Sequence, residues 1–149
     1  MHASMTTILV ALTMHVTGGL PWDVDEYPNP QQDPIGCARS GERSTWVCDP
    51  DRLLAIDEAN LLDRQITKVK NHTGCPCDDS CTGPGGRHHR GFAIAVALAE
   101  KIIRGKGEHE TEIFVENLRK LWHIGLCGED IVIFFNEQRD EGFSPAFLG

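Results

Sequence analysis

The sequence predicts an α/β domain with a short, mainly parallel sheet flanked by helices. Three stretches in the second half of the chain carry this prediction. Residues 92–99 (FAIAVALA) alternate large apolar residues with alanines, which is the period-two pattern of a β-strand. Residues 110–122 carry one apolar stripe at helical spacing, and residues 131–135 (IVIFF) are a short, β-branched apolar run. Strand, helix and strand in this order predict a βαβ unit with parallel strands and a right-handed crossover.

The first 18 residues have the shape of a secretory signal peptide. Residues 8–14 are an apolar run too short to span a bilayer, and the small residues 16–18 would precede a cleavage point. The positive segment that usually opens a signal peptide is missing, because the first basic residue is Arg39. The alternative is a buried strand or helix at the start of the domain. We expect residues 1–18 to be a signal peptide.

The next two segments differ in periodicity. Residues 19–36 carry four prolines and little aliphatic periodicity, which predicts an extended segment that leads into the domain. Residues 57–70 have apolar residues at spacings of three and four, with acids in the first turn and lysines in the last, which predicts a helix. The apolar face expected for this helix consists of Ala59, Leu62, Ile66 and Val69.

The strand at 92–99 is apolar on both sides, so we expect it to be covered on both faces, with the alanine face allowing a close helix. The stripe expected on the helix at 110–122 consists of Phe114, Val115, Leu118, Leu121 and Trp122.

The chain is short after its last predicted strand. Residues 136–149 are too few for another helix and strand, so the strand at 131–135 would have an exposed edge. We therefore expect a domain over residues 37–140 that is incomplete, or completed by another chain, followed by an irregular tail at 141–149.

Charge and cysteine content narrow the functional classes. A formal net charge of −8 argues against a nucleic-acid-binding protein and against a basic patch that binds anionic membranes. Six cysteines in 149 residues indicate three disulfides in a secreted protein. Asn71-His72-Thr73 is an N-glycosylation sequon, so we expect Asn71 to be glycosylated.

Several stretches occur in an order that matches a known family. They are YPNPQQDP, C…STWVCDPDRLL, DEANLLD, TGCPC…C, GFAIAVAL and LRKLWHIGLCGEDIVIFF. Together they resemble the modulator of levamisole receptor family, the secreted animal branch of the TPM domain superfamily, which includes a thylakoid acid phosphatase. The resemblance runs from about Tyr27 to Asp140 and implies a TPM-like α/β domain, stapled by disulfides.

The resemblance also implies a function. Members are extracellular auxiliary subunits of acetylcholine-gated ion channels, so the implied partners are receptor subunits at the cell surface, with no enzyme activity and no cofactor. Family members usually continue with a further strand, a helix and a membrane helix, which this sequence lacks. We therefore expect membrane association through the partner or through a missing C-terminal helix. Ala55 stands where the family often has a helix-capping Ser or Thr.

The six cysteines lie where that family has them, at Cys37, Cys48, Cys75, Cys77, Cys81 and Cys127. They allow about fifteen pairings, among which the sequence does not choose. Our working expectation is a local Cys37–Cys48 bridge and a bridge from Cys127 to the cluster at 75–81, with the other two cysteines pairing within that cluster. The alternatives are a zinc site completed by His88 or His89 and a redox site, but the latter needs C-x-x-C spacing.

Acidic residues suggest one alternative function. Asp49 and Asp51, with Glu129 and Asp130, are the nearest approach to a metal site, which would suit a TPM-type metal-dependent acid phosphatase. We expect Asp49 and Asp51 to make turn and capping hydrogen bonds instead. Glu129 and Asp130 precede a strand, the wrong end for the crevice where α/β sheets bind ligands. A secreted interaction module with another partner is the third hypothesis.

Overall fold

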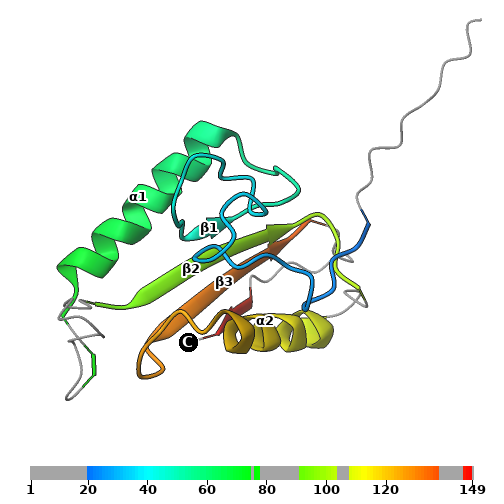
Figure 1. Ribbon diagram of the computed structural model, residues 1–149. Helices are drawn as coiled ribbons and strands as arrows, with labels where there is room; N and C mark the ends of the chain where they lie inside the picture. The colour runs from blue at the N-terminus through cyan, green and yellow to red at the C-terminus, as the bar shows by residue number, and fades with distance from the viewer. Residues whose placement is uncertain (1–19, 75, 78–90, 104–107, 138–145, 149) are drawn as a thin grey trace, which may run out of the picture.

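The computed structural model describes residues 20–74, 76–77, 91–103, 108–137 and 146–148. Within them, one sheet lies between two helices, with α1 over one face and α2 against the other (Figure 1). The sheet order is β1-β2-β3-β4, in which β1, β2 and β3 are parallel and β4 is antiparallel to β3. The elements are β1 (Val47–Cys48), α1 (Ile56–His72), β2 (Ala93–Ala99), α2 (Glu108–Trp122), β3 (Asp130–Asn136) and β4 (Ala146–Leu148).

The predicted α/β class is confirmed. The two long strands and the two helices begin and end within one or two residues of the predicted bounds. β2 and β3 pair in parallel from Ala93 with Asp130 to Ala99 with Asn136, and α2 connects them, as the βαβ prediction requires. No helix in the described part of the chain is both long and apolar enough to cross a membrane.

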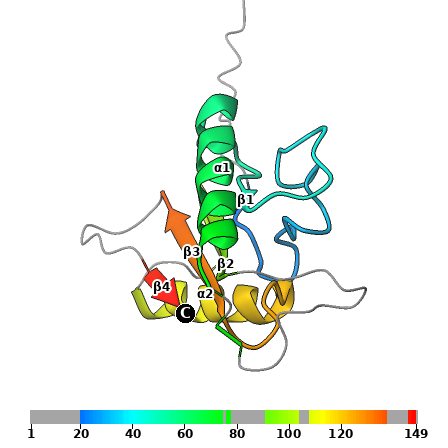
Figure 2. The same ribbon diagram turned by 90° about the vertical axis from the view of Figure 1, so that its left-hand side faces the viewer.

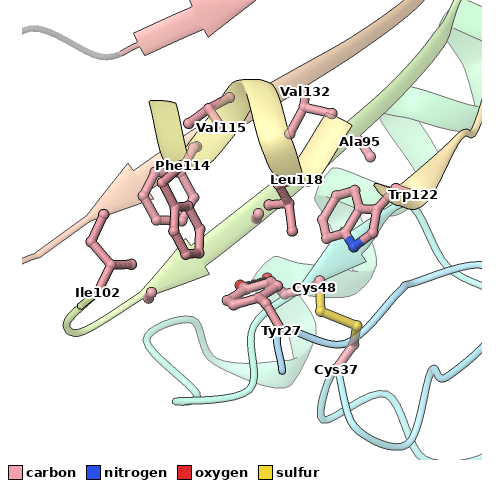
Figure 3. Packing of buried hydrophobic residues seen from close by; sticks show 13 residues of the cluster. Tyr27, Cys37, Cys48, Ala95, Ile102, Phe114, Val115, Leu118, Trp122 and Val132 are labelled. Atoms are coloured by element: carbon pink, nitrogen blue, oxygen red, sulfur yellow. Dashed lines mark hydrogen bonds between the residues drawn. A yellow bond between two sulfur atoms is a disulfide. The ribbon is translucent and has the colours of Figure 1, made fainter. Parts of the chain in front are cut away.

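The alternation along β2 decides what covers each face of the sheet. The alanines of β2 belong to the buried cluster that contains α2 and Tyr27, so the small side chains let these segments approach closely (Figure 3). Val96 and Leu98 point to the other face and pack in a cluster with Ala59 and Ile66 of α1. The prediction that both faces of this strand are covered is confirmed.

The apolar stripes of the helices are narrower than predicted. Val69 is 40% exposed and Leu121 is 52% exposed. An α-helix turns about 100° per residue, so Val69 lies about 80° around α1 from Ala59. Leu121 is displaced because Leu118 and Trp122, one helical turn apart, take the position that faces the sheet. Including Val69 and Leu121 in the buried stripes was therefore wrong.

The segment before β1 is a series of turns and not the extended segment predicted for residues 19–36. It lies beside the β1 edge of the sheet (Figure 2). Trp22 pairs in parallel with Ile102, because the Trp22 N–H donates to Lys101 O (3.0 Å) and the Ile103 N–H donates to Trp22 O (2.9 Å). Prolines rule out a continuous ladder here but allow turns, whose backbone donors are bonded locally.

Tyr27 ties this segment to the sheet. Its ring is buried and lies edge-on to Trp22 and Phe114, with centroid distances of 5.4 and 6.0 Å. Its hydroxyl oxygen lies 2.6 Å from Leu98 O and 3.1 Å from Cys48 O. The single phenolic O–H is thus shared between the carbonyls of Leu98 and Cys48, near the ends of two neighbouring strands. A buried tyrosine hydroxyl needs such a partner.

Two disulfides join distant parts of the described structure. Cys37–Cys48 anchors the N-terminal turns to β1 and lies beside Tyr27 (Figure 3). Cys77–Cys127 joins the segment after α1 to the segment before β3, with a Cα–Cα distance of 6.0 Å. Both bridges agree with the working expectation. Cys75 and Cys81 lie outside the described residues.

The outer edge of β3 is paired, in contrast to the exposed edge expected from the sequence. Val132, Ile133 and Phe134 pair with residues 146–148, which form β4 inside the segment predicted as an irregular tail. An antiparallel return needs only a short connection, so three residues suffice to satisfy this part of the edge.

The first prediction concerns Tyr27, the only tyrosine of the chain. Burial, and then the charges of Asp49 and Asp51, raise the pKa of its phenol above the ordinary 10.0. The unfolded chain loses this proton near about pH 10, whereas the folded chain keeps it, so stability is full below that pH and falls as the pH rises toward the raised pKa. Tyrosinate absorbance should therefore appear only together with unfolding. A folded protein with a tyrosinate transition near pH 10 would contradict this.

The second prediction concerns the Cys77–Cys127 bridge, whose cysteines are 50 residues apart in sequence. Loop-closure entropy gives a bridge of this span about 4 kcal/mol of stabilisation. The double variant Cys77→Ser/Cys127→Ser should lower the free energy of unfolding, measured by urea titration, by a substantial fraction of this value and by about 4 kcal/mol at most. An unchanged urea midpoint would show that the bridge does not restrict the unfolded chain.

Candidate functional site

The carboxyl ends of the parallel strands are the first place to look for chemistry in an α/β sheet. Asp49 follows β1 directly, and Asp51 reaches the end of β2, where its Oδ2 accepts a hydrogen bond from the Glu100 N–H (2.7 Å). The turn at residues 49–51 thus lies in the crevice where a ligand would be expected.

The oxygens of both aspartates are already engaged. The buried Asp49 carboxylate accepts from the Leu53 N–H (2.9 Å) and the Leu54 N–H (2.7 Å). The Asp51 carboxylate accepts from the Trp22 indole N–H through both oxygens, at 3.1 and 3.0 Å. The expectation that these residues serve turn chemistry therefore agrees with the contacts, although their partners also include a distant indole and the end of β2.

Glu129 and Asp130 lie at the opposite edge of the sheet. Asp130 begins β3 and pairs with Ala93, whereas Phe134 is level with Cys48 of β1. Four residues of strand separate these levels, about 13 Å. The structure therefore does not bring Glu129 and Asp130 together with the aspartates of the 49–51 turn.

These two acids have structural partners of their own. Arg119 of α2 donates to Asp130 Oδ1 (2.9 Å) and to Asp130 O (3.1 Å), which fixes the start of β3 to α2. The Glu129 carboxylate accepts from the N–H groups of Leu126 and Cys127. Burial opposes ionisation of Glu129, but these hydrogen bonds and the charge of Lys70 outweigh it, so its pKa lies below the ordinary value.

The cysteine cluster is not a zinc site in the described part of the chain. Ligand atoms of Cys77, Cys127 and Glu129 lie within 4.8 Å of one another. Zinc binds cysteine as a free thiolate, and both cysteines here are joined in a disulfide. His88 and His89, the other ligands considered, lie outside the described residues.

The sequon asparagine lies in the last turn of α1, and Asn71 is exposed. The Thr73 hydroxyl donates to Val69 O (2.8 Å) and accepts from the Phe92 N–H (3.2 Å), so it connects the helix end to the residue before β2. The amine nitrogen of Lys70, the residue before Asn71, lies 4.2 Å from the ring centroid of Trp46. Burial lowers the pKa of this amine.

The side chains that hold the N-terminal turns in place were not predicted from the sequence. Asp63 of α1 accepts from the Thr45 hydroxyl (2.8 Å) and from the Trp46 N–H (2.6 Å). Asn29 donates to Trp122 O (3.2 Å) at the end of α2. No local pattern marks such contacts, because each partner is far away in the sequence.

One family model matches the chain. It is described as modulator of levamisole receptor-1 and matches residues 22–140. No curated protein matches the chain, and no solved structure matches it.

The third prediction concerns Asp49. The variant Asp49→Ala leaves the Leu53 and Leu54 N–H groups without their acceptor, so the free energy of unfolding should fall by about 2–3 kcal/mol. Asp25→Ala, at an exposed position, is the control and should change it by less than about 0.5 kcal/mol. Urea titrations at constant m-value measure both, and equal effects would refute the structural role of Asp49.

Proposed function

Because the chain belongs to the modulator of levamisole receptor-1 family, we propose that it is an extracellular modulatory domain of an acetylcholine-gated ion channel. It acts by binding receptor subunits and not by catalysis. The observation that carries the proposal is the extent of the family match, which takes in both helices and all three parallel strands.

An extracellular location is supported by the covalent structure. Disulfides persist in oxidising compartments, and this domain has two among its described residues. The exposed Asn71 offers an N-glycosylation site, and residues 1–18 have the pattern of a secretory signal. We include these features in the proposal, together with association with the membrane through the receptor or a C-terminal helix.

Action without catalysis is supported by the carboxyl edge of the sheet. A phosphatase of the TPM type would need carboxylate oxygens free to bind a metal ion. The oxygens of Asp49 and Asp51 instead accept hydrogen bonds that hold turns and the N-terminal segment in place. The same carboxylates therefore have a structural explanation.

The test is the agonist-evoked current of an acetylcholine-gated channel, expressed with and without the full chain. The proposal predicts a reproducible change in peak current or in agonist sensitivity. The secreted amount and the folded state of the chain are measured in parallel. An unchanged current in the presence of folded, secreted protein would refute the proposal for that channel.

Two controls sharpen this fourth prediction. The Cys77→Ser/Cys127→Ser variant is less stable, so its effect on the current should fall with its folded fraction. Purified chain is also tested on a phosphate ester with and without divalent cations. Release of phosphate that depends on the metal and is lost in Asp51→Asn would favour the phosphatase hypothesis instead.

A further inference from the structure

A pocket lies between the N-terminal turns and the start of α1, and it shares Asp49 with the carboxyl edge of the sheet discussed above. Its volume is about 190 Å³. Its lining combines arginine and aspartate residues with aliphatic ones. The residues that matter here are Arg39, Asp49, Arg52, Leu54, Ile56 and Ala59. We call it the Arg39 pocket.

Arg39 is buried without a counterion among the described residues. Its side chain is 3% exposed, and its Nε and Nη1 atoms are buried with no hydrogen-bond partner. None of the ion pairs in the described residues involves Arg39. Arginine stays protonated in proteins, so the charge remains in place. Burying an unpaired charge is costly, and arginines are seldom fully buried unless they are paired.

The backbone holds Arg39 in this position. It follows the bridged Cys37 and Ala38, whose φ of 57° reverses the chain. The Arg39 N–H donates to Pro34 O (2.7 Å), and its carbonyl accepts from the Glu42 N–H (3.3 Å). Because the turn is covalently and locally fixed, the guanidinium cannot easily leave for solvent.

Among the described residues that line the pocket, the arginines outnumber the acids by two to one. Asp49 is the one acid that lines it, and both of its oxygens accept main-chain hydrogen bonds. Arg52, held at a φ of 58°, adds a second guanidinium. The nearby Glu58 carboxylate is occupied by the Ala55 N–H (2.9 Å). The described lining thus contains two arginines and one aspartate, with the Glu58 carboxylate bound to the main chain of the adjoining helix start.

The start of α1 borders the pocket, and its first turn carries main-chain N–H groups together with the acids Asp57 and Glu58. Ile56 and Ala59 of its first turn line the pocket, and Ala55 has no side-chain oxygen to cap the helix. The free N–H groups of a helix N-terminus carry a partial positive charge that favours anions. With the unpaired guanidinium, this makes two independent features that fit an anion.

From these observations we propose that the Arg39 pocket binds a carboxylate on a short aliphatic stem. A guanidinium N–H donates a charge-assisted hydrogen bond to a carboxylate, and the aliphatic lining residues suit the stem. The volume is below the range of about 300–1,000 Å³ of ordinary small-molecule pockets. The pocket is therefore suited to a small group and not to a ligand of ordinary size. This inference does not depend on the proposed channel function.

The test, and the fifth prediction, follows the ¹⁵N-labelled full chain by NMR during titration with sodium butyrate, with sodium chloride at equal ionic strength as the control. Binding predicts saturable shifts of the Arg39 side-chain N–H and of the first-turn amides of α1. Chloride should give no saturable shift. Equal responses to both salts would overturn the proposal.

Variants locate the binding site. Arg39→Leu should weaken butyrate binding by about tenfold or more, as expected for loss of a charge-assisted hydrogen bond. Arg52→Ala removes an exposed side chain, whose charge is screened by solvent, and should weaken butyrate binding by about threefold. Arg64→Ala removes an equal charge from an exposed position on α1 that is absent from the described pocket lining, and it should change nothing. If Arg39→Leu fails to fold, the test rests on the butyrate affinity of Arg52→Ala and on the shift of the Arg39 side-chain N–H signal in the wild type. Equal losses in Arg52→Ala and Arg64→Ala would refute the site.

Two arms distinguish the source of the carboxylate. A peptide with blocked ends and a single glutamate is compared with the same peptide carrying glutamine. Tighter binding of the glutamate peptide than of butyrate, with no binding of the glutamine peptide, would identify an acidic side chain of a protein as the occupant. Binding of butyrate alone would identify a free small carboxylate. Binding of neither would overturn the proposal.

Discussion

The rest of the structure depends on one property of β2, which is that both of its faces are buried but by side chains of different size. Its alanines let α2 and the ring of Tyr27 come close to the sheet, while Val96 and Leu98 fill the wider space beneath α1. A layer on each side is what a parallel strand requires. Because β2 also pairs with β1 on one edge and with β3 on the other, every layer of the domain meets at this strand.

The second constraint acts at the β1 edge, where the strand itself has only two residues. So short a strand contributes few ladder hydrogen bonds. The surrounding turns compensate through Tyr27, through the disulfide at Cys48 and through Asp63 of α1. A domain of this size has a limited core, and covalent and side-chain ties of this kind are the usual remedy.

Sequence periodicity was sufficient for the elements with a strong pattern. The strands at 93–99 and 130–136 and both helices were predicted closely, since burial on one or both faces imposes a period that the sequence displays. The turns before β1 and the three-residue β4 were not predicted. Their positions depend on contacts with residues far along the chain, and neither segment is long enough to show a period.

The same distinction holds for the candidate sites. The turn role of Asp49 was foreseen from the Asp-Pro-Asp sequence, because both of its acceptor bonds are local. The indole partner of Asp51 and the burial of Arg39 were not foreseen, since Arg39 stands in a stretch as polar as any surface loop. Only the folded chain shows which polar residue of such a loop is enclosed.

The position of the Cys77–Cys127 bridge also bears on how the domain withstands proteolysis. β2 and α2 both lie between its two cysteines, whereas the Cys37–Cys48 bridge lies wholly before them. A peptide bond cut between Cys77 and Cys127 therefore releases no fragment, because the pieces remain joined as one covalent molecule. A cut between Cys48 and Cys77, as in α1, separates the chain into two pieces that only packing and pairing with β2 hold together. Among the two helices and the two long strands, α1 and β3 thus lie outside both disulfide loops, and a cut in either is resisted by folding alone.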